Sequence, residues 1–170
     1  MKRIYLFSVI LTTLIIAFGC SNSKQDLSQR HNTTAGASTP KKFMQREDYS
    51  CIITNNGITK TYHTTGIYDL YHILNTDKEF LNGASIKDRA IGKAAAALMI
   101  IGGVKEAQTP IISTPAKNLL LKHGVKVTYE KEVDNILNRN KTGLCPMEKR
   151  ITDTESLYEI YNKIHEFVNE

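Results

Sequence analysis

The chain has 170 residues, of which 41% are hydrophobic, so it is long enough for one compact domain with short additional segments. Its formal net charge is +5, spread along the chain rather than gathered into one strongly basic block. Because no aromatic stripe lies among the lysines, the charge pattern argues against a nucleic-acid-binding surface. We therefore expect no nucleic-acid partner.

The first 19 residues have the pattern of an export signal. A short basic start precedes an apolar run, residues 4–18, which is shorter than a comfortable membrane-spanning helix. The sequence Ala17-Phe18-Gly19-Cys20 resembles a bacterial lipobox, in which the cysteine carries lipid and becomes the new N-terminus. We expect residues 1–19 to be a lipoprotein signal peptide and Cys20 to be lipidated. An ordinary signal peptide or an uncleaved anchor is the alternative.

Lipid on Cys20 predicts a lipid-anchored membrane protein of the bacterial cell envelope, since each buried methylene adds about 0.8 kcal/mol to anchoring. Residues 20–42 are polar and have too little apolar surface to fold, so they are expected to form a flexible tether. A domain is expected over residues 43–150, followed by an amphipathic helix over residues 151–170.

In the first half of the domain, the sequence predicts a short lead-in helix over residues 43–49, followed by a β-hairpin. Two β-rich runs, residues 51–54 and 58–62, flank Asn55-Asn56-Gly57, which is a strong turn signal. Apolar residues at helical spacing over residues 67–74 then predict an amphipathic helix of about two turns.

Residues 85–103 predict the central helix. Ser85 is placed to cap its first turn, with Asp88 three residues later as a capping-box acid. Almost every residue from 90 to 101 is small or apolar, so the helix is expected to be buried on most sides and to end at Gly102.

The second half alternates strands and helices. We expect a strand over residues 104–112, a helix opened by Ser113-Thr114-Pro115, and a strand over residues 125–129. This order predicts an α/β domain with a mixed sheet and helices packed on it. Thr152 and Glu155 form a capping-box pattern before a last amphipathic helix, whose apolar stripe is expected to dock on the domain.

An ordered set of short motifs resembles one known family, the small bacterial group called domain of unknown function 1893. The motifs are Asp88-Arg89-x-x-Gly92-Lys93-Ala94-Ala95-Ala96, Ser113 at a helix start, Asn138-Arg139 and Cys145-Pro146-Met147-Glu148. The resemblance covers roughly residues 48–150. It implies a cytidine-deaminase-like fold, a three-layer α/β/α arrangement around a mixed sheet.

The resemblance does not extend to the chemistry of a zinc deaminase. Such an enzyme needs His or Cys with Glu near the start of its central helix and Pro-Cys-x-x-Cys at the start of the next. The chain contains neither a His-x-Glu nor a Cys-x-x-Cys sequence, and its five histidines are scattered. We therefore predict no metal site and no cofactor.

In this fold the pocket is expected at the N-termini of the two crossover helices. That arrangement would join Asp88 and Ser113, with Lys93, Cys145 and Glu148 as further ligand-binding candidates. Free amides at helix N-termini favour a polar or anionic ligand. Of these residues, Asp88, Cys145 and Glu148 are also the catalytic candidates.

Each candidate also has a structural alternative. Asp88 and Ser113 can act only as helix caps, and Lys93 on an apolar helix can form a buried ion pair with Glu148 or Asp88. Cys145 can be a nucleophile, a small core residue or the partner of Cys51 in a disulfide.

Three functions follow from these alternatives. The leading hypothesis is a membrane-anchored lipoprotein whose zinc-free domain binds a small polar ligand, nucleoside-like or anionic. The second is an enzyme that uses Cys145 as nucleophile or Asp88 and Glu148 as acid and base. The third is a non-catalytic interaction module of the cell envelope.

Overall fold

The computed structural model describes residues 48–64 and 67–170. The chain divides into two units, residues 1–39 and 40–170, and every described residue belongs to the second unit. The predicted signal peptide, Cys20, the tether and most of the lead-in helix over residues 43–49 lie outside the described residues. Within the described residues, no helix is long and apolar enough to span a membrane.

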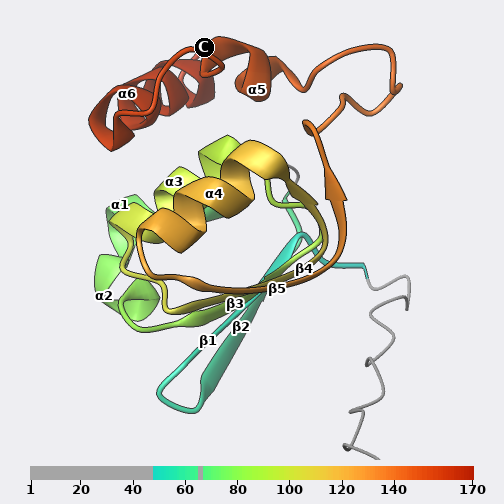
Figure 1. Ribbon diagram of the computed structural model, residues 1–170. Helices are drawn as coiled ribbons and strands as arrows, with labels where there is room; N and C mark the ends of the chain where they lie inside the picture. Colours follow the sequence, from blue (N-terminus) through green and yellow to red (C-terminus); the bar gives the residue numbers. More distant parts are fainter. Residues whose placement is uncertain (1–47, 65–66) are drawn as a thin grey trace, which may run out of the picture. The chain divides into compact units, whose positions relative to one another are not determined.

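Five strands form one mixed sheet in the order β2-β1-β3-β4-β5 (Figure 1). Strand β1 is antiparallel to β2 and β3, whereas β3, β4 and β5 run parallel to one another. The strands are β1 (Cys51–Asn55), β2 (Ile58–Tyr62), β3 (Ser85–Asp88), β4 (Glu106–Ser113) and β5 (Lys126–Val133).

The predicted hairpin is confirmed. Strands β1 and β2 pair from Cys51 opposite Tyr62 to Asn55 opposite Ile58. The turn between them places Asn56 at φ 48° and Gly57 at φ 77°. Two successive positive φ values are what a type I′ hairpin turn requires, and Asn-Gly adopts them at low cost.

The helices α1, α3 and α4 lie on the same side of the sheet, and α6 lies beyond them (Figure 1). Helices α3 and α4 are the crossovers that connect β3 to β4 and β4 to β5, as parallel strands require. The α/β class predicted from the element order is therefore confirmed. The helices are α1 (Tyr68–Thr76), α2 (Lys78–Leu81), α3 (Lys93–Ile101), α4 (Thr114–Lys122), α5 (Pro146–Arg150) and α6 (Leu157–Val168).

The predicted start of the central helix is wrong. Residues Ser85–Asp88 form strand β3, paired on one side with β1 and on the other with β4. The Ile86 side chain of this strand packs in the core and is fully buried. A four-residue strand is too short to show a periodic pattern of apolar residues, so the helix-capping pattern of Ser85 and Asp88 dominated the prediction. Residues 85–88 form a strand because both of their edges pair with neighbouring strands.

Helix α3 begins instead at Lys93, with Gly92 as its N-cap, and is buried nearly all round as predicted. It contacts α1, α4, α5 and α6. The helix ends at Gly102 as predicted; Gly102 keeps helical dihedral angles, and the next residue, Gly103, has a positive φ of 78°.

The last helix, α6, begins at Leu157, so the predicted capping box at Thr152 and Glu155 is wrong. The Ser156 hydroxyl caps α6 by accepting a hydrogen bond from the Glu159 amide. Ser156 and Glu159 repeat the same spacing four residues later, which is why the motif was placed too early. The predicted docking is confirmed, because Ile160 and Ile164 are fully buried and α6 packs on α3.

Candidate ligand pocket

A pocket of about 830 Å³ opens where β3 ends and α3 begins. Its walls come from five places: the end of β3 with the turn after it, the first residues of α3, the loop over residues 136–145, helix α5, and the facing ends of α1 and α6. The loop is held in shape by backbone hydrogen bonds from Cys145 to Ile136 and from Asn138 to Gly143, each 2.9 Å long.

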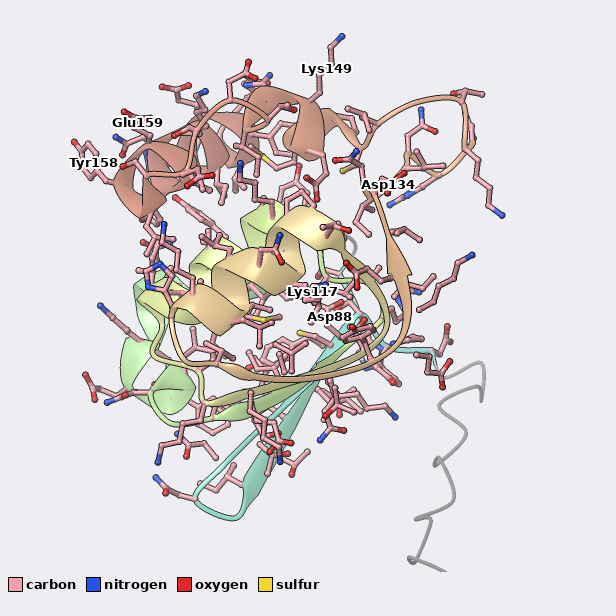
Figure 2. The ribbon with its side chains drawn as sticks, in the orientation of Figure 1. Asp88, Lys117, Asp134, Lys149, Tyr158 and Glu159 are labelled. Carbon is pink, nitrogen blue, oxygen red and sulfur yellow. The ribbon has the colours of Figure 1, made fainter. Side chains whose placement is uncertain are left out.

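Asp88 is the last residue of β3 and lines this pocket (labelled in Figure 2). Its Oδ1 accepts a hydrogen bond of 3.1 Å from the Ala90 amide. Burial raises the pKa of Asp88 to about 7, and the charge of Asp69 adds to the rise, while the Ala90 amide and the Arg89 charge oppose it. Near neutral pH, Asp88 is therefore present in both protonation states.

Glu148, in α5, reaches the amino end of α3. Its side chain is 4% exposed, and Oε1 accepts a hydrogen bond of 2.8 Å from the Lys93 amide. One of the free amides at the start of α3 is thus taken by a carboxyl group of the protein itself. Burial raises the pKa of Glu148, opposed by that hydrogen bond and by the Lys93 charge.

Gly92 makes this approach of Glu148 possible. A Cβ atom at position 92 would lie 2.2 Å from Glu148 Oε1 and 3.2 Å from a side-chain carbon of Ile136. The closest neighbour of position 92 is therefore the buried carboxyl group of Glu148.

Lys93 is buried but is not among the residues that line the pocket. Its Nζ donates hydrogen bonds of 3.1 Å and 3.2 Å to the backbone carbonyls of Ile151 and Thr152. The ammonium group therefore anchors the residues that follow α5, with backbone carbonyls in place of the carboxylate partner considered from the sequence.

Ser113 is also absent from the pocket lining. It is fully buried, and its Oγ accepts a hydrogen bond of 3.3 Å from the Ala116 amide at the start of α4. Its role as an N-cap, the structural alternative, is confirmed. Of the two helix starts expected at the pocket, α3 lines it, whereas Ser113 at the start of α4 does not.

Cys145 lines the pocket and is partly exposed, directly before α5. Cys51 is buried in β1, where burial raises the pKa of its thiol to about 12, reinforced by the charges of Asp88 and Asp69. Both cysteines are free thiols, so the disulfide considered between them is not formed in this structure. Of these two thiols, the one of Cys145 is partly exposed and lines the pocket.

Several lining residues were not among the sequence candidates. Tyr68 of α1 and Phe167 of α6 face each other with ring centroids 6.4 Å apart. No local sequence motif indicates that either aromatic residue lines a pocket. Arg89 and Arg139 also line the pocket, and both stand in motifs that carry the family resemblance, which was the signal available for them.

Within residues 48–64 and 67–170, no three His, Cys, Asp or Glu side chains gather closely enough to hold a metal ion. The pocket's titratable groups are instead two carboxyl groups, one thiol, one phenol and two guanidinium groups.

The chain belongs to the DUF1893 family, a domain of unknown function, whose family model matches residues 39–168. The resemblance stated from the sequence is therefore confirmed. The match is wider than residues 48–150, and it includes helix α6, which the sequence motifs had left outside the family's domain.

The fold is similar to that of a DUF1893 family protein from Thermotoga maritima, known from its crystal structure. The TM-score is 0.64 at 21% sequence identity, and the match covers 70% of this chain and 80% of that chain. At this identity the likeness concerns the fold. No curated protein matches the chain.

Proposed function

We propose that the protein is a membrane-anchored lipoprotein whose zinc-free, cytidine-deaminase-like domain binds a small polar ligand in the pocket between β3 and α3. The observation that supports binding most directly is that Asp88, Cys145 and Glu148, distant in the sequence, line one pocket. A few convergent polar groups in a concave site with apolar walls are typical of a small-molecule site.

The pocket volume of about 830 Å³ also suits a ligand of metabolite size. The Tyr68 and Phe167 rings offer apolar flat surfaces, and Asp88 and Glu148 offer hydrogen-bonding groups. These features are compatible with a nucleoside-like ligand, which the fold analogy suggests.

The binding hypothesis is tested by thermal unfolding of the full chain with a panel of nucleosides and other polar metabolites. A ligand that binds only the folded state raises the melting temperature in a concentration-dependent way. The Asp88→Asn variant should lose this rise, and Lys149→Gln should retain it, because the Lys149 side chain points away from α5 into solvent (Figure 2). If no compound stabilises the wild type, the binding hypothesis fails.

The proposed membrane anchor rests on the lipobox-like sequence that ends at Cys20. Only a thiol can form the thioether to the lipid, so Cys20→Ser should abolish labelling by radioactive palmitate and release the protein from the membrane fraction. Cys51→Ser is the matched control and should remain labelled. Equal labelling of Cys20→Ser and the wild type would exclude lipidation at Cys20.

A second candidate function is catalysis with Cys145 as nucleophile or with Asp88 and Glu148 as acid and base. The observation that favours it is that a partly exposed thiol shares the pocket with Asp88, whose pKa of about 7 suits proton transfer at neutral pH. Catalysis predicts that a compound that binds is also converted, and that Cys145→Ser binds it without conversion.

A further inference from the structure

Building on the proposed membrane anchor, we propose that the loop after β5, residues 134–145, docks on an anionic lipid surface. Leu137 and Leu144 enter the headgroup region, and Arg139 and Lys141 contact the anionic headgroups. The inference rests on the place of this loop in the fold, on its exposed leucine pair and on its cations.

The loop projects from the domain and has a defined shape. The chain leaves the end of β5 in a wide arc, orange in Figure 1, that extends beyond the sheet before it returns to α5. The Asn138 side chain closes the tip of the loop. Its Oδ1 accepts a hydrogen bond of 2.9 Å from the Thr142 amide, and its Nδ2 donates one of 3.0 Å to the Thr142 hydroxyl. The loop therefore presents its side chains from a hydrogen-bonded frame.

The two leucines of the loop lie side by side. Leu137 and Leu144 form an isolated antiparallel bridge, and the backbone hydrogen bonds on either side of it join residue 138 to 143 and residue 145 to 136. In a non-hydrogen-bonded pair of this kind, the two side chains lie on the same face and close together. Leu137 is nevertheless 50% exposed and Leu144 37% exposed. The loop thus presents a small apolar surface to its surroundings.

Two cations stand in the turn between the leucines. Arg139 and Lys141 are exposed, and neither forms a salt bridge within the ranges 48–64 and 67–170. The acidic residue of the loop is Asp134, at its base (labelled in Figure 2). Next to an anionic bilayer, each lysine or arginine strengthens binding about fivefold. Leucines that enter the interface beside cations that stay at the headgroups are typical of a membrane-surface contact.

The backbone at Lys141 is strained. Its φ is 56°, in the left-handed region where glycine and asparagine are favoured. Asn56 has the other positive φ among the non-glycine residues that the structure describes, and its residue type tolerates it. A lysine at such a position costs energy that a glycine would avoid. Contact with anionic headgroups gives a physical reason for a cation at the tip of the loop.

The charge of the C-terminal segment makes it a poorer candidate for the same partner. Tyr158 of α6 is 74% exposed. Residues 151–170, however, contain five acidic residues and one lysine. An anionic surface would repel this segment, so the comparison favours the loop.

A lipid surface also suits the loop better than a protein partner. Stable protein–protein interfaces bury about 1,000 Å² or more, of which two leucine side chains can supply only a small part. A chain anchored at Cys20 needs only a weak further contact, because residues 21–47 reach at most roughly 95 Å when fully extended. The anchor would keep the loop at a high effective concentration near the bilayer.

The test uses a fluorescent reporter in the loop. The chain contains no tryptophan, so Leu144→Trp introduces a single one at a partly exposed position. The full-length variant is mixed with vesicles of brominated phosphatidylcholine, with or without phosphatidylglycerol. Quenching is divided by the fraction of protein that sediments with the vesicles. We expect a blue shift and quenching on the vesicles that contain phosphatidylglycerol.

Two further tryptophan variants make the reporter decisive. Leu137→Trp should behave as Leu144→Trp does, and it replaces that variant if Leu144→Trp fails to fold. Tyr158→Trp, on the exposed face of α6, is the matched control and should be neither shifted nor quenched. Equal quenching of the loop and α6 reporters, or none in the loop, would overturn the inference.

Charge variants in the Leu144→Trp protein test the role of the cations. Arg139→Gln and Lys141→Gln should each raise the lipid concentration for half-maximal quenching about fivefold, and added salt should act in the same direction. Lys122→Gln removes the same charge at the end of α4, before β5 begins, and should leave this concentration unchanged. Quenching that does not depend on phosphatidylglycerol would exclude headgroup recognition by Arg139 and Lys141.

The outcomes separate this inference from the anchor on which it builds. If the wild type incorporates palmitate at Cys20 but the loop reporter is not quenched on sedimented protein, the anchor stands and the docking fails. If the loop reporter is quenched but no palmitate is incorporated, the docking stands and the anchor fails. If neither is observed, both proposals fail.

Discussion

The Glu148 carboxyl group and the Lys93 backbone amide are 2.8 Å apart, so a residue from α5 caps the first turn of the buried helix α3. The contact joins chain segments 55 positions apart and depends on the missing side chain of Gly92. It also fixes the wall of the pocket, because Gly92 and Glu148 both line it.

The first prediction concerns Gly92→Ala. The new Cβ would lie 2.2 Å from Glu148 Oε1, so the carboxyl group must move and the Lys93 amide loses its partner. We expect the free energy of unfolding to fall by about 1–3 kcal/mol, measured by urea denaturation. Gly143→Ala is the control, because a Cβ there meets no atom within 4 Å. Equal stability of the two variants would contradict the proposed role of Gly92.

The second prediction is the pH dependence of stability in Asp88→Asn. In the folded protein the pKa of Asp88 is about 7, above its ordinary value of 3.8, so between these pH values the folded state binds more protons than the unfolded state. The free energy of unfolding of the wild type should therefore fall as pH rises through this range, by at most about 1.4 kcal/mol per pH unit, and level off above it.

Asparagine does not titrate, and its side-chain oxygen can still accept the Ala90 hydrogen bond. Asp88→Asn should thus show a shallower decline with pH and exceed the wild type in stability at about pH 8. The raised pKa of Glu148 gives a residual slope of the same sign in both proteins. Parallel stability profiles over the whole range would show that Asp88 titrates normally.

The third prediction concerns Lys93→Met, which keeps the length of the side chain and removes its charge. The carbonyls of Ile151 and Thr152 each lose a hydrogen bond, so the free energy of unfolding should fall by about 2 kcal/mol. Lys149→Met, on an exposed side chain, should change it by less than about 0.5 kcal/mol. A neutral or stabilising effect of Lys93→Met would show that these bonds do not offset the burial of the charge.

The fourth prediction is selective alkylation. Iodoacetamide should modify Cys145 in the folded protein near neutral pH, because its side chain is partly exposed in the pocket. Cys51 should react only on unfolding, since its thiol is buried and has a pKa of about 12. Peptide mass spectrometry distinguishes the two sites, and modification of Cys51 at the faster rate would contradict the structure.

The fifth prediction tests the docking of α6. Ile164 is fully buried, so Ile164→Ala should lower the free energy of unfolding by about 2–4 kcal/mol. Tyr158, on the same helix, is 74% exposed and points away from the neighbouring helices (Figure 2), so Tyr158→Ala should stay within about 0.5 kcal/mol of the wild type. Similar stabilities of the two variants would mean that α6 does not pack as described.

The features that local sequence determines were predictable. The Asn56-Gly57 turn and the Ser113 cap depend on φ angles and hydrogen bonds within a few residues, and the structure has both. Strand β3 was missed because Ser85–Asp88 becomes a strand only through pairing with β1 and β4, which no local pattern encodes.

The pocket residues were likewise predictable only where a local motif marked them. Short sequence motifs pointed to Asp88, Cys145 and Glu148, and all three line the pocket. Lys93 and Ser113 were also in motifs, but their side-chain polar atoms bond to backbone groups outside the pocket lining. Tyr68 and Phe167 meet because α6 packs on α3 and its side chains contact α1, so their place depends on tertiary structure alone.

Two sets of hydrogen bonds join α3 to the α5 region. The Glu148 carboxyl group of α5 accepts a hydrogen bond from the Lys93 backbone amide, and the Lys93 ammonium group donates to the backbone carbonyls of Ile151 and Thr152, just after α5. A molecule that draws the Glu148 carboxyl group toward the cavity must therefore compete for it with the Lys93 backbone N–H of the buried helix α3. The hydrogen-exchange rate and NMR chemical shift of that single amide should then report occupancy of the cavity, giving a direct assay that needs no knowledge of any reaction.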